Sequence, residues 1–521
     1  MDIFRYGTED NRFNSDYKCD LREKLDAIKS EGNSSSIAAL WRETENFEMN
    51  NNFQRFYLFK EVADDLKFDN QLKVNLILEW IKFSPPKPNI SWNAFNCSVR
   101  LINWVKILIS VSDDYEISKE DFYTISNSIY KHIQIIRQNI EYHIPGNHVL
   151  IQYFSIFFTL TLFDNWDFSE KLNEIFEKNF IEEFEKEFPN RQFHFEHSSH
   201  YHIQIILIGI YYYIISKKKM GKIPANIVKE RLLDISELMT FFKIGDDRLV
   251  MLGDNCYPFF HDSLKNDYQN VFALFKYLEF DLNNSTNKVI IRDPYIFCAK
   301  GNSKLIYDVG LIGLEQNPGH GHADIQSVIF SDNDKPIFID PGTRNYSNKK
   351  DDIHVKKTIS HNTLSIDGED QALNWGFFRW AYLPTRPVFK IEDFNDSLVI
   401  KSSFHGFKHL GGITHSRNIE LMEGKLSITD SVPNLIDKNV ELNFILNPEI
   451  ICKTDDNCMI FNLNDLKWKL EVGSAIPHRF NISEISIYPE YDFPVHSNKV
   501  QILFESFTGD FHSQINFQRI L

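Results

Sequence analysis

Three histidines and one aspartate between residues 317 and 371 have the types and spacing for acid–base or metal chemistry. His320 and His322 are two residues apart, so both rings project to one face if this segment is extended. Asp340 stands just before a Pro-Gly turn, and His361 precedes another apolar segment. Two imidazoles and one carboxylate, from His322, Asp340 and His361, are a plausible ligand set for zinc. Such residues at turns are also common as hydrogen-bonded loop residues, and spacing alone leaves both interpretations open.

Short strands are expected to position these side chains. Apolar residues alternate with other residues in segments 327–330 and 336–339, which a polar turn joins. This pattern predicts a β-hairpin. The apolar segment 363–366 is a third candidate strand. The polar residues therefore stand at strand ends, where neighbouring strands could bring the candidate ligands together.

The first half of the chain is predicted to be helical. From about residue 36 to residue 280, apolar residues recur at spacings of three and four, as in Leu72 and Leu76, and strand-like alternation is rare. A run of helices joined by short polar turns is typical of a bundle or an (α/α) toroid. The most apolar segments, 149–163 and 203–215, are shorter than the ~20 residues of a membrane span. We therefore expect buried helices and no transmembrane segment.

A polar cluster precedes each of these two apolar segments. Asn147 and His148 stand before the first apolar segment, and the run from Glu196 to His202 stands before the second. Helix N-termini carry free N–H groups and the positive end of the helix dipole, so they attract carboxylates. Two such ends facing one cavity would suit an acidic sugar. Helix capping and buried polar packing would explain the same residues without a ligand.

The second half of the chain is predicted to be β. Around residues 281–287 the composition turns polar, and the hydrophobic period changes to two. Short strands separated by turn residues then continue to the C-terminus, a spacing typical of an antiparallel β-sandwich. We therefore expect a helical domain over residues 1–285 and a β-sandwich domain over residues 286–521.

Composition and charge argue against several functions. The 521 residues carry a formal net charge of −16, whereas nonspecific nucleic-acid binding needs a basic face. No P-loop, Rossmann glycine motif or G-x-S-x-G elbow is found, which argues against nucleotide chemistry and a serine hydrolase. The N-terminus has no apolar signal region. The sequence therefore predicts a cytoplasmic location, with the periplasm or cell envelope as the alternative.

Three segments of the second half resemble a known family. The runs PGHGHAD, IDPGTRNY and SHNTLSIDGEDQ follow one another in the order found in the C-terminal domain of the heparinase II/III-like polysaccharide lyases. The resemblance implies that His320 is catalytic. It also implies that His322, Asp340 and His361 bind one structural zinc ion.

The first half resembles the toroid of the same family. The run SWNAFNCSVRLINW is similar to its tryptophan-rich element, with Ala and Phe where that element has Pro and Tyr, and GNHVL and FHFEHSSHYH are similar to its catalytic helices. The resemblance implies that Asn147 meets the substrate carboxylate with His148 beside it. It makes Tyr201 the catalytic tyrosine, supported by Glu196, with His202 in the same run as a substrate-binding residue.

Two further residues are candidate substrate contacts. Arg379 belongs to the aromatic and basic run QALNWGFFR, which resembles a family segment near the cleft, and His405 belongs to HGFKHLGGITHSR. Core packing is the alternative explanation for both runs.

The resemblance implies cleavage of a uronic-acid-containing polysaccharide by β-elimination, which leaves an unsaturated uronate end. The expected partner is an acidic polysaccharide or oligosaccharide. Two other functions remain open: a glycan-binding protein of surface-polysaccharide biosynthesis with reduced turnover, and a toroid glycoside hydrolase. A hydrolase needs two carboxylic acids at its cleft, and the sequence offers Glu196 without a clear second acid.

Overall fold

The computed structural model describes residues 69–87, 89–111, 115–144, 146–163, 169–218, 226–244, 248–255, 271, 273–280, 286–314, 318–344, 353–376, 378–455, 458–490 and 493–520. These residues form two compact units. The helical unit holds the described residues up to Glu187 together with Ile208–Lys229. The β unit holds Phe188–Leu207 and the described residues from Glu230 onward. The domain boundary expected between residues 285 and 286 stays a prediction.

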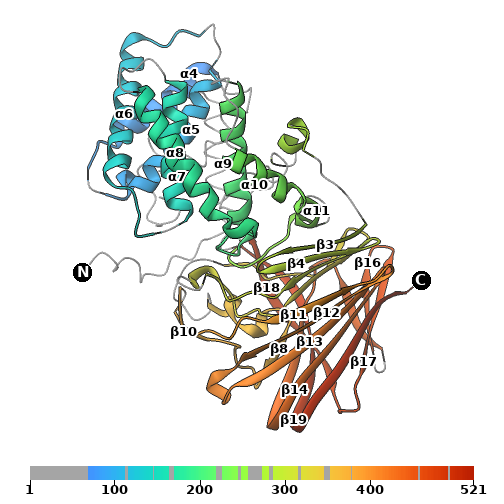
Figure 1. Cartoon of the computed structure of the whole chain (residues 1–521). Helices are drawn as coiled ribbons and strands as arrows, with labels where there is room; N and C mark the ends of the chain where they lie inside the picture. Colours follow the sequence, from blue (N-terminus) through green and yellow to red (C-terminus); the bar gives the residue numbers. More distant parts are fainter. Residues whose placement is uncertain are drawn as a thin grey trace. The chain divides into compact units, whose positions relative to one another are not determined.

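The helical unit is a series of α-helices that lie side by side (Figure 1). Its elements are α4 (Asn70–Phe83), η2 (Ile90–Trp92), α5 (Ala94–Ile109), α6 (Lys119–Gln138), α7 (Asn147–Leu162), α8 (Ser169–Glu187) and the later residues of α9 (Ser199–Lys218). Asp69, Asn93 and Ser118 precede α4, α5 and α6, and each side chain accepts a hydrogen bond from a first-turn N–H group. Such caps satisfy backbone donors that have no partner within the helix.

Helix α7 lies in the core of the helical unit. Every residue from Val149 to Thr161 is buried, and the helix packs against α5 and α8. Its polar side chains are satisfied locally, since Thr159 Oγ1 donates to Ser155 O at 2.7 Å. This confirms the buried helix predicted from segment 149–163. Among the described residues, no helix is both long enough and apolar enough to span a membrane.

The tryptophan-rich run and Trp80 of α4 together surround a buried cation, Arg100. Arg100 of α5 is fully buried, with its guanidinium carbon 3.9 Å from the Trp80 ring centroid and 5.5 Å from that of Trp92. Its Nε donates to His132 Nε2 at 2.9 Å. Burial lowers the pKa of Arg100 to about 10. Cation–π contacts compensate part of the cost of burying this charge, so the motif has a structural role in joining α4, α5 and α6.

The β unit begins with helical elements: η3 (Pro189–Arg191), the first residues of α9, most of α10 (Asn226–Ser236) and α11 (Met239–Phe242). A two-stranded hairpin of β1 (Lys243–Ile244) and β2 (Arg248–Leu249) follows them. Residues 250–255 follow as a loop, and Asp254 of this loop contacts His320 and His322.

A five-stranded antiparallel sheet comes next. Its strands are ordered as they follow in sequence: β3 (Asn287–Arg292), β4 (Tyr295–Lys300), β5 (Ser303–Asp308), β6 (Val328–Asp332) and β7 (Lys335–Phe338). Strands β6 and β7 pair as a hairpin, with Phe330 opposite Phe338. This confirms the hairpin predicted from segments 327–330 and 336–339.

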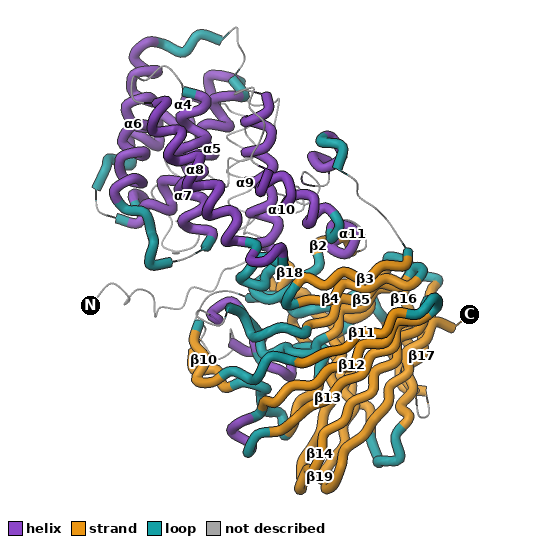
Figure 2. The backbone as a smooth tube through the Cα atoms, in the orientation of Figure 1, coloured by secondary structure: helices purple, strands orange, loops and turns teal. Residues whose placement is uncertain are grey.

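A ten-stranded antiparallel sheet completes the unit (Figure 2). Its order is β11-β12-β13-β14-β19-β17-β16-β15, with β18 on β19 and β8 on β14. The strands are β8 (Leu364–Ile366), β11 (Val388–Asp393), β12 (Ser397–Gly406), β13 (Ile413–Met422), β14 (Lys425–Ile445), β15 (Ile451–Asp455), β16 (Cys458–Leu463), β17 (Leu466–Gly473), β18 (Arg479–Glu490) and β19 (Phe493–Ile520). A separate hairpin pairs β9 (Leu373–Gly376) with β10 (Arg379–Tyr382).

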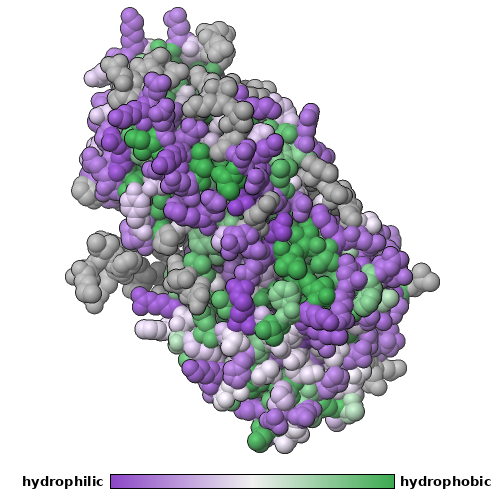
Figure 3. Space-filling model, viewed as in Figure 1, coloured by the Kyte–Doolittle hydropathy of each residue, from purple (hydrophilic) through white to green (hydrophobic). Residues whose placement is uncertain are grey.

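The two larger sheets share one hydrophobic core. Leu305 and Phe330 of the five-stranded sheet belong to the same buried cluster as Ile400, Phe444 and Phe517 of the ten-stranded sheet. Two antiparallel sheets that bury their facing side chains form a sandwich, which confirms the predicted β fold. Hydrophilic side chains cover most of the face drawn in Figure 3, with smaller hydrophobic patches among them.

Candidate functional site

The HxH segment lies in the β unit, between β5 and β6. His320 ends the short helix η4 (Pro318–His320), and His322 follows one glycine later. A Cβ atom on Gly321 would stand 2.5 Å from Gly313 N, so only glycine fits between the two histidines. Close backbone packing therefore holds the HxH segment in place.

Tyr201 and His320 lie next to each other, although 119 positions separate them in the sequence. Their ring centroids are 5.3 Å apart, in an edge-on arrangement. The carboxylate of Glu196 lies 3.6 Å from His320 Nε2. Phe378 borders the same imidazole, with its ring centroid 5.6 Å away. The structure thus brings together three of the predicted site residues: Glu196, Tyr201 and His320.

Asp254 is the functional candidate that the sequence reasoning missed. One of its oxygens lies 2.7 Å from His320 Nδ1, and the other lies 2.9 Å from His322 Nε2. Lys356 Nζ is 3.1 Å from the same carboxylate, and Thr343 Oγ1 donates to it at 3.0 Å. A Gly-Asp-Asn run at residues 253–255 was the available signal, but nothing in it points to histidines 66 and 68 positions away.

These contacts set the charges at the site. Burial alone would raise the pKa of Asp254, but the Lys356 charge and the bonds from His320 and His322 outweigh burial and hold that pKa well below its usual range. Burial would lower the pKa of His320, but its bond to Asp254 and the nearby Glu196 carboxylate raise it. These two carboxylates therefore favour the protonated form of His320.

A buried group of donors that could hold a metal ion lies beside the catalytic candidates. One ligand atom from each of His322, Asp324 and His361 lies within 4.8 Å of the other two, and all three residues are buried. Among the described residues, His322 Nδ1 and His361 Nε2 have no hydrogen-bond partner. Their opposite nitrogens face carboxylates, which only accept hydrogen bonds, so in the neutral rings these two atoms carry free lone pairs. Two buried lone pairs beside a carboxylate are a donor set suited to a divalent cation.

Asp340 lies against the Nδ1 side of the His361 ring. Its Oδ2 lies 2.9 Å from His361 Nδ1, and its Oδ1 accepts a hydrogen bond from Gly342 N at 2.9 Å. Asp340 thereby orients the imidazole of His361, while Asp324 joins the two histidines. The ligand role of Asp340 stays a prediction. Asp324, two residues after His322 in the same motif, is the donor that the sequence analysis did not single out.

Asn147 and His148 lie in the helical unit, at the start of α7. Asn147 is the first residue of the helix and is only 8% exposed. The His148 ring stacks on Phe95 at a centroid distance of 3.8 Å. Its Nδ1 lies 2.8 Å from the carboxylate of Glu141, which also accepts a bond from Gln152 Nε2 at 2.9 Å. Phe95 and Glu141 therefore fix the orientation of His148.

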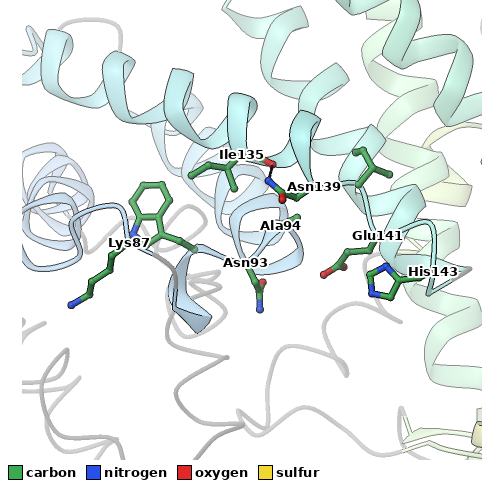
Figure 4. A pocket seen from close by; sticks show the side chains of 9 residues that line it. Lys87, Asn93, Ala94, Ile135, Asn139, Glu141 and His143 are labelled. Carbon is green, nitrogen blue, oxygen red and sulfur yellow. Dashed lines mark hydrogen bonds between the residues drawn. The ribbon is translucent and has the colours of Figure 1, made fainter. Parts of the chain in front are cut away.

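A pocket of about 630 Å³ opens next to this group in the helical unit (Figure 4). Trp92, Asn93 and Asn139 contribute to its wall, together with the charged side chains of Lys87 and Glu141. Glu141 is the link between this pocket and His148. The mixture of an indole, two amides and charged groups is suited to a polar ligand such as a sugar.

Two family models match the chain. Heparinase II/III N-terminus matches residues 36–282, and Heparinase II/III-like, C-terminal, matches residues 292–517. The chain belongs to the heparinase II/III-like family. No curated protein matches the chain in sequence.

Solved structures show that the heparinase II/III-like fold extends over both units. The crystal structure of heparinase III has a TM-score of 0.72 at 16% identity, covering 92% of this chain and 79% of that one. A mutant of heparan sulfate lyase HepC from Pedobacter heparinus gives 0.67 at 15%, covering 92% and 78%. A chondroitinase AC lyase gives 0.54 at 8%, covering 96% and 80%. These similarities confirm the predicted fold, a partial (α/α) toroid followed by antiparallel β-sheets.

The remaining residues predicted for a heparinase II/III-like site differ in their surroundings. Arg379 and His405 are exposed. Arg379 lies over the exposed Trp375 ring at 5.7 Å and directly follows Phe378, which borders His320. His202 is fully buried, stacked on Phe193 at 4.1 Å, and its Nδ1 accepts a bond from His194 N. These contacts pack His202 inside the β unit, and substrate contacts by His202, Arg379 and His405 stay predictions.

Proposed function

We propose that this protein cleaves a uronate-containing acidic polysaccharide by β-elimination. The observation that carries the proposal is the pairing of Tyr201 with His320, a phenol and an imidazole whose ring centroids are 5.3 Å apart. The similar structures named above include lyases of heparan sulfate and chondroitin. A glycosaminoglycan-type substrate is therefore the first class to test.

The reaction needs hydrogen-bond donors for the carboxylate, a base and an acid. The C5 proton of a uronate is weakly acidic, so its carboxylate must be stabilised by hydrogen-bond donors while the proton leaves. The Asn147 amide, with His148 beside it, supplies such donors. The electron pair of the C5–H bond forms the C4–C5 double bond, and the C4–O bond to the next sugar breaks. The leaving oxygen takes up a proton, and no water is consumed.

Tyr201 and His320 divide the two proton transfers between them. The Nδ1 hydrogen of His320 is donated to Asp254, which leaves Nε2 to exchange a proton with the substrate or with Tyr201. Glu196, 3.6 Å from Nε2, stabilises the protonated form of the ring. Which of the two residues removes the C5 proton depends on the stereochemistry of the substrate.

A zinc ion would have a structural role in this proposal. His322 and His361, with Asp324 or Asp340, would hold it. Its charge would fix the HxH segment and the start of β8 with respect to each other. The proton transfers themselves belong to Tyr201 and His320.

The test is ultraviolet absorbance during incubation with heparan sulfate, chondroitin sulfate, hyaluronan and alginate, with a neutral glycan as control. Only elimination creates a double bond conjugated to the carboxylate, so rising absorbance with an acidic glycan is the expected result. New reducing ends without absorbance would indicate a hydrolase, and binding without cleavage would indicate a glycan-binding protein. Either result would contradict the proposed function.

A further inference from the structure

We propose that Asp254 is a positioning residue shared by the catalytic histidine and the metal-binding histidine. The part that concerns turnover rests on the proposed lyase function, whereas the part that concerns metal affinity does not. The two oxygens of this carboxylate serve different rings, His320 Nδ1 at 2.7 Å and His322 Nε2 at 2.9 Å. Because a carboxylate only accepts hydrogen bonds, both of these nitrogens must carry a hydrogen.

This arrangement fixes the tautomer of both rings. In His320 the opposite nitrogen, Nε2, is left for proton exchange beside Glu196. In His322 the opposite nitrogen, Nδ1, is a buried atom of the candidate metal site, and no described residue forms a hydrogen bond with it. A hydrogen-bonded carboxylate behind a metal-binding histidine sets ring orientation and raises ligand basicity. Here one carboxylate does this for a metal-binding ring and for a catalytic ring at once.

The surroundings of Asp254 keep its carboxylate in place. The residue is 1% exposed. Lys356 Nζ lies 3.1 Å from Asp254 and also donates to Gly319 O at 2.7 Å, so it holds the peptide just before His320 as well. The positive charge of Lys356 offsets the cost of burying the carboxylate.

The backbone of the same loop holds the helix that carries Tyr201. Ser198 Oγ donates to Asp254 O at 2.8 Å, and Ser199 Oγ donates to Val250 O at 2.6 Å. Gly253 has φ +59°, and a Cβ atom there would stand 2.9 Å from His197 O. The loop thus approaches the start of α9 closely on one side and contacts the HxH segment on the other. Asp254 is the residue at which these contacts meet.

Asp254→Asn tests the proposal with little change in volume. An amide offers one acceptor oxygen and one NH2 group, so it cannot accept from both imidazoles. We expect zinc affinity, measured by chelator competition, to fall 10–100-fold, the range found for groups that orient metal ligands. On a substrate that the wild type cleaves, we expect kcat to fall about 100-fold or more with KM nearly unchanged.

Asp430→Asn is the matched control. Asp430 is also fully buried, accepts from an imidazole, His415 Nε2, at 2.7 Å, and pairs with a cation, Arg417, at 2.7 Å. It belongs neither to the candidate metal group nor to the catalytic candidates. Its loss should lower thermal stability while zinc affinity and kcat stay at wild-type values. An equal fall of zinc affinity in both variants would mean general destabilisation and would overturn the assignment.

A measurement on the wild type covers the case in which Asp254→Asn does not fold. In the zinc-loaded protein with 15N-labelled histidine, the proposal requires hydrogen on His320 Nδ1 and on His322 Nε2. The signals are assigned with His320→Gln and His322→Gln variants. Metal bound through His322 Nε2, or His320 in the opposite tautomer, would overturn the proposal. If the wild type fails to cleave any acidic glycan, the proposed function fails, but the tautomers and zinc affinity still decide the role of Asp254.

Discussion

The pKa values of histidines in this protein shift in opposite directions, depending on the groups around each ring. His320, His194 and His202 are histidines of the β unit, but burial lowers the pKa of His194 to about 4 and that of His202 well below its ordinary value. His320 faces the carboxylates of Asp254 and Glu196, and these outweigh burial and raise its pKa. The surrounding charges therefore distinguish a histidine suited to proton transfer from histidines that pack as neutral rings.

Tyr201→Phe should remove one proton-transfer group and leave the fold intact. The phenyl ring keeps the edge-on contact with His320, whereas the hydroxyl is lost. We expect turnover on a proven substrate to fall by about 10²-fold or more, the scale for a general acid or base. Tyr213→Phe, farther along the same helix, is the control and should retain activity. Near wild-type elimination by Tyr201→Phe would falsify the proposed mechanism.

Asn147→Ala should lower turnover through a different cause. The amide is proposed to stabilise charge that develops on the uronate carboxylate, and removing one such donor costs about 10²–10³-fold in kcat. Helix α7 should persist, because no side-chain hydrogen bond caps its N-terminus, where Gly146 is the N-cap residue, and burial of its side chains stabilises the helix. Steady-state kinetics and circular dichroism separate these effects. Unchanged kcat with a folded variant would remove Asn147 from the mechanism.

At the scale of elements, the candidate metal group joins parts of the chain that are distant in sequence. His322 and Asp324 precede β6, Asp340 follows β7, and His361 precedes β8. Strand β8 pairs with β14 of the ten-stranded sheet, whereas β6 and β7 belong to the five-stranded sheet. A bound cation would therefore link segments next to strands of both sheets and fix the HxH segment with respect to β8.

Substitutions at the candidate metal site should distinguish the roles of Asp324 and Asp340 in zinc binding. His361→Ala should lose stoichiometric zinc and lower the unfolding free energy by a few kcal/mol, because the binding energy of a structural metal stabilises the fold. Asp324→Asn should also lose zinc, whereas Asp340→Asn should weaken it 10–100-fold by releasing the His361 ring. Elemental analysis and thermal melts measure both quantities. The reverse order for the two aspartates would instead support Asp340 as the ligand that the motifs predict.

At the scale of the whole molecule, buried neutral histidines make stability depend on pH. His132, His194, His202 and His415 are fully buried, and burial lowers the pKa of each one. In the unfolded chain each group takes up a proton near its ordinary pKa of 6.5. Below that pH the unfolded state binds more protons than the folded state, so stability falls as pH falls.

The contribution of these four histidines to the unfolding free energy should be nearly constant above pH 7 and should decrease as the pH falls from 6.5 toward 4. His320 and His361, whose pKa values are raised, contribute in the opposite direction, so the net decrease reflects the excess of buried neutral histidines. The expected slope is about 1.4 kcal/mol per pH unit for each histidine that stays neutral. Urea denaturation at a series of pH values measures it. His496→Gln, an exposed position, should leave the slope unchanged. A midpoint that stays level or rises on acidification would contradict this prediction.

The fold class could be predicted from the sequence, and so could a group of candidate site residues that lie close together. Helical periodicity and period-two alternation report which side chains face a core, and they predicted buried α7 and the β6–β7 hairpin because burial imposes those periods locally. The motifs identified Tyr201, Glu196 and His320, which do lie together. The order of these motifs along the chain can be read from the sequence without the folded structure.

The groups that contact those residues could not be predicted, because they come from distant loops that meet only in the folded chain. Asp254 and His320 are 66 positions apart, and no local pattern encodes a contact between a loop after β2 and a turn before β6. Periodicity says which face a residue occupies, but not which residue packs against it, so the stacking of the buried His202 on Phe193 is seen only in the folded chain. The same holds for the grouping of Asp324 with His322 and His361 and for the contact of Asp340 with His361 Nδ1.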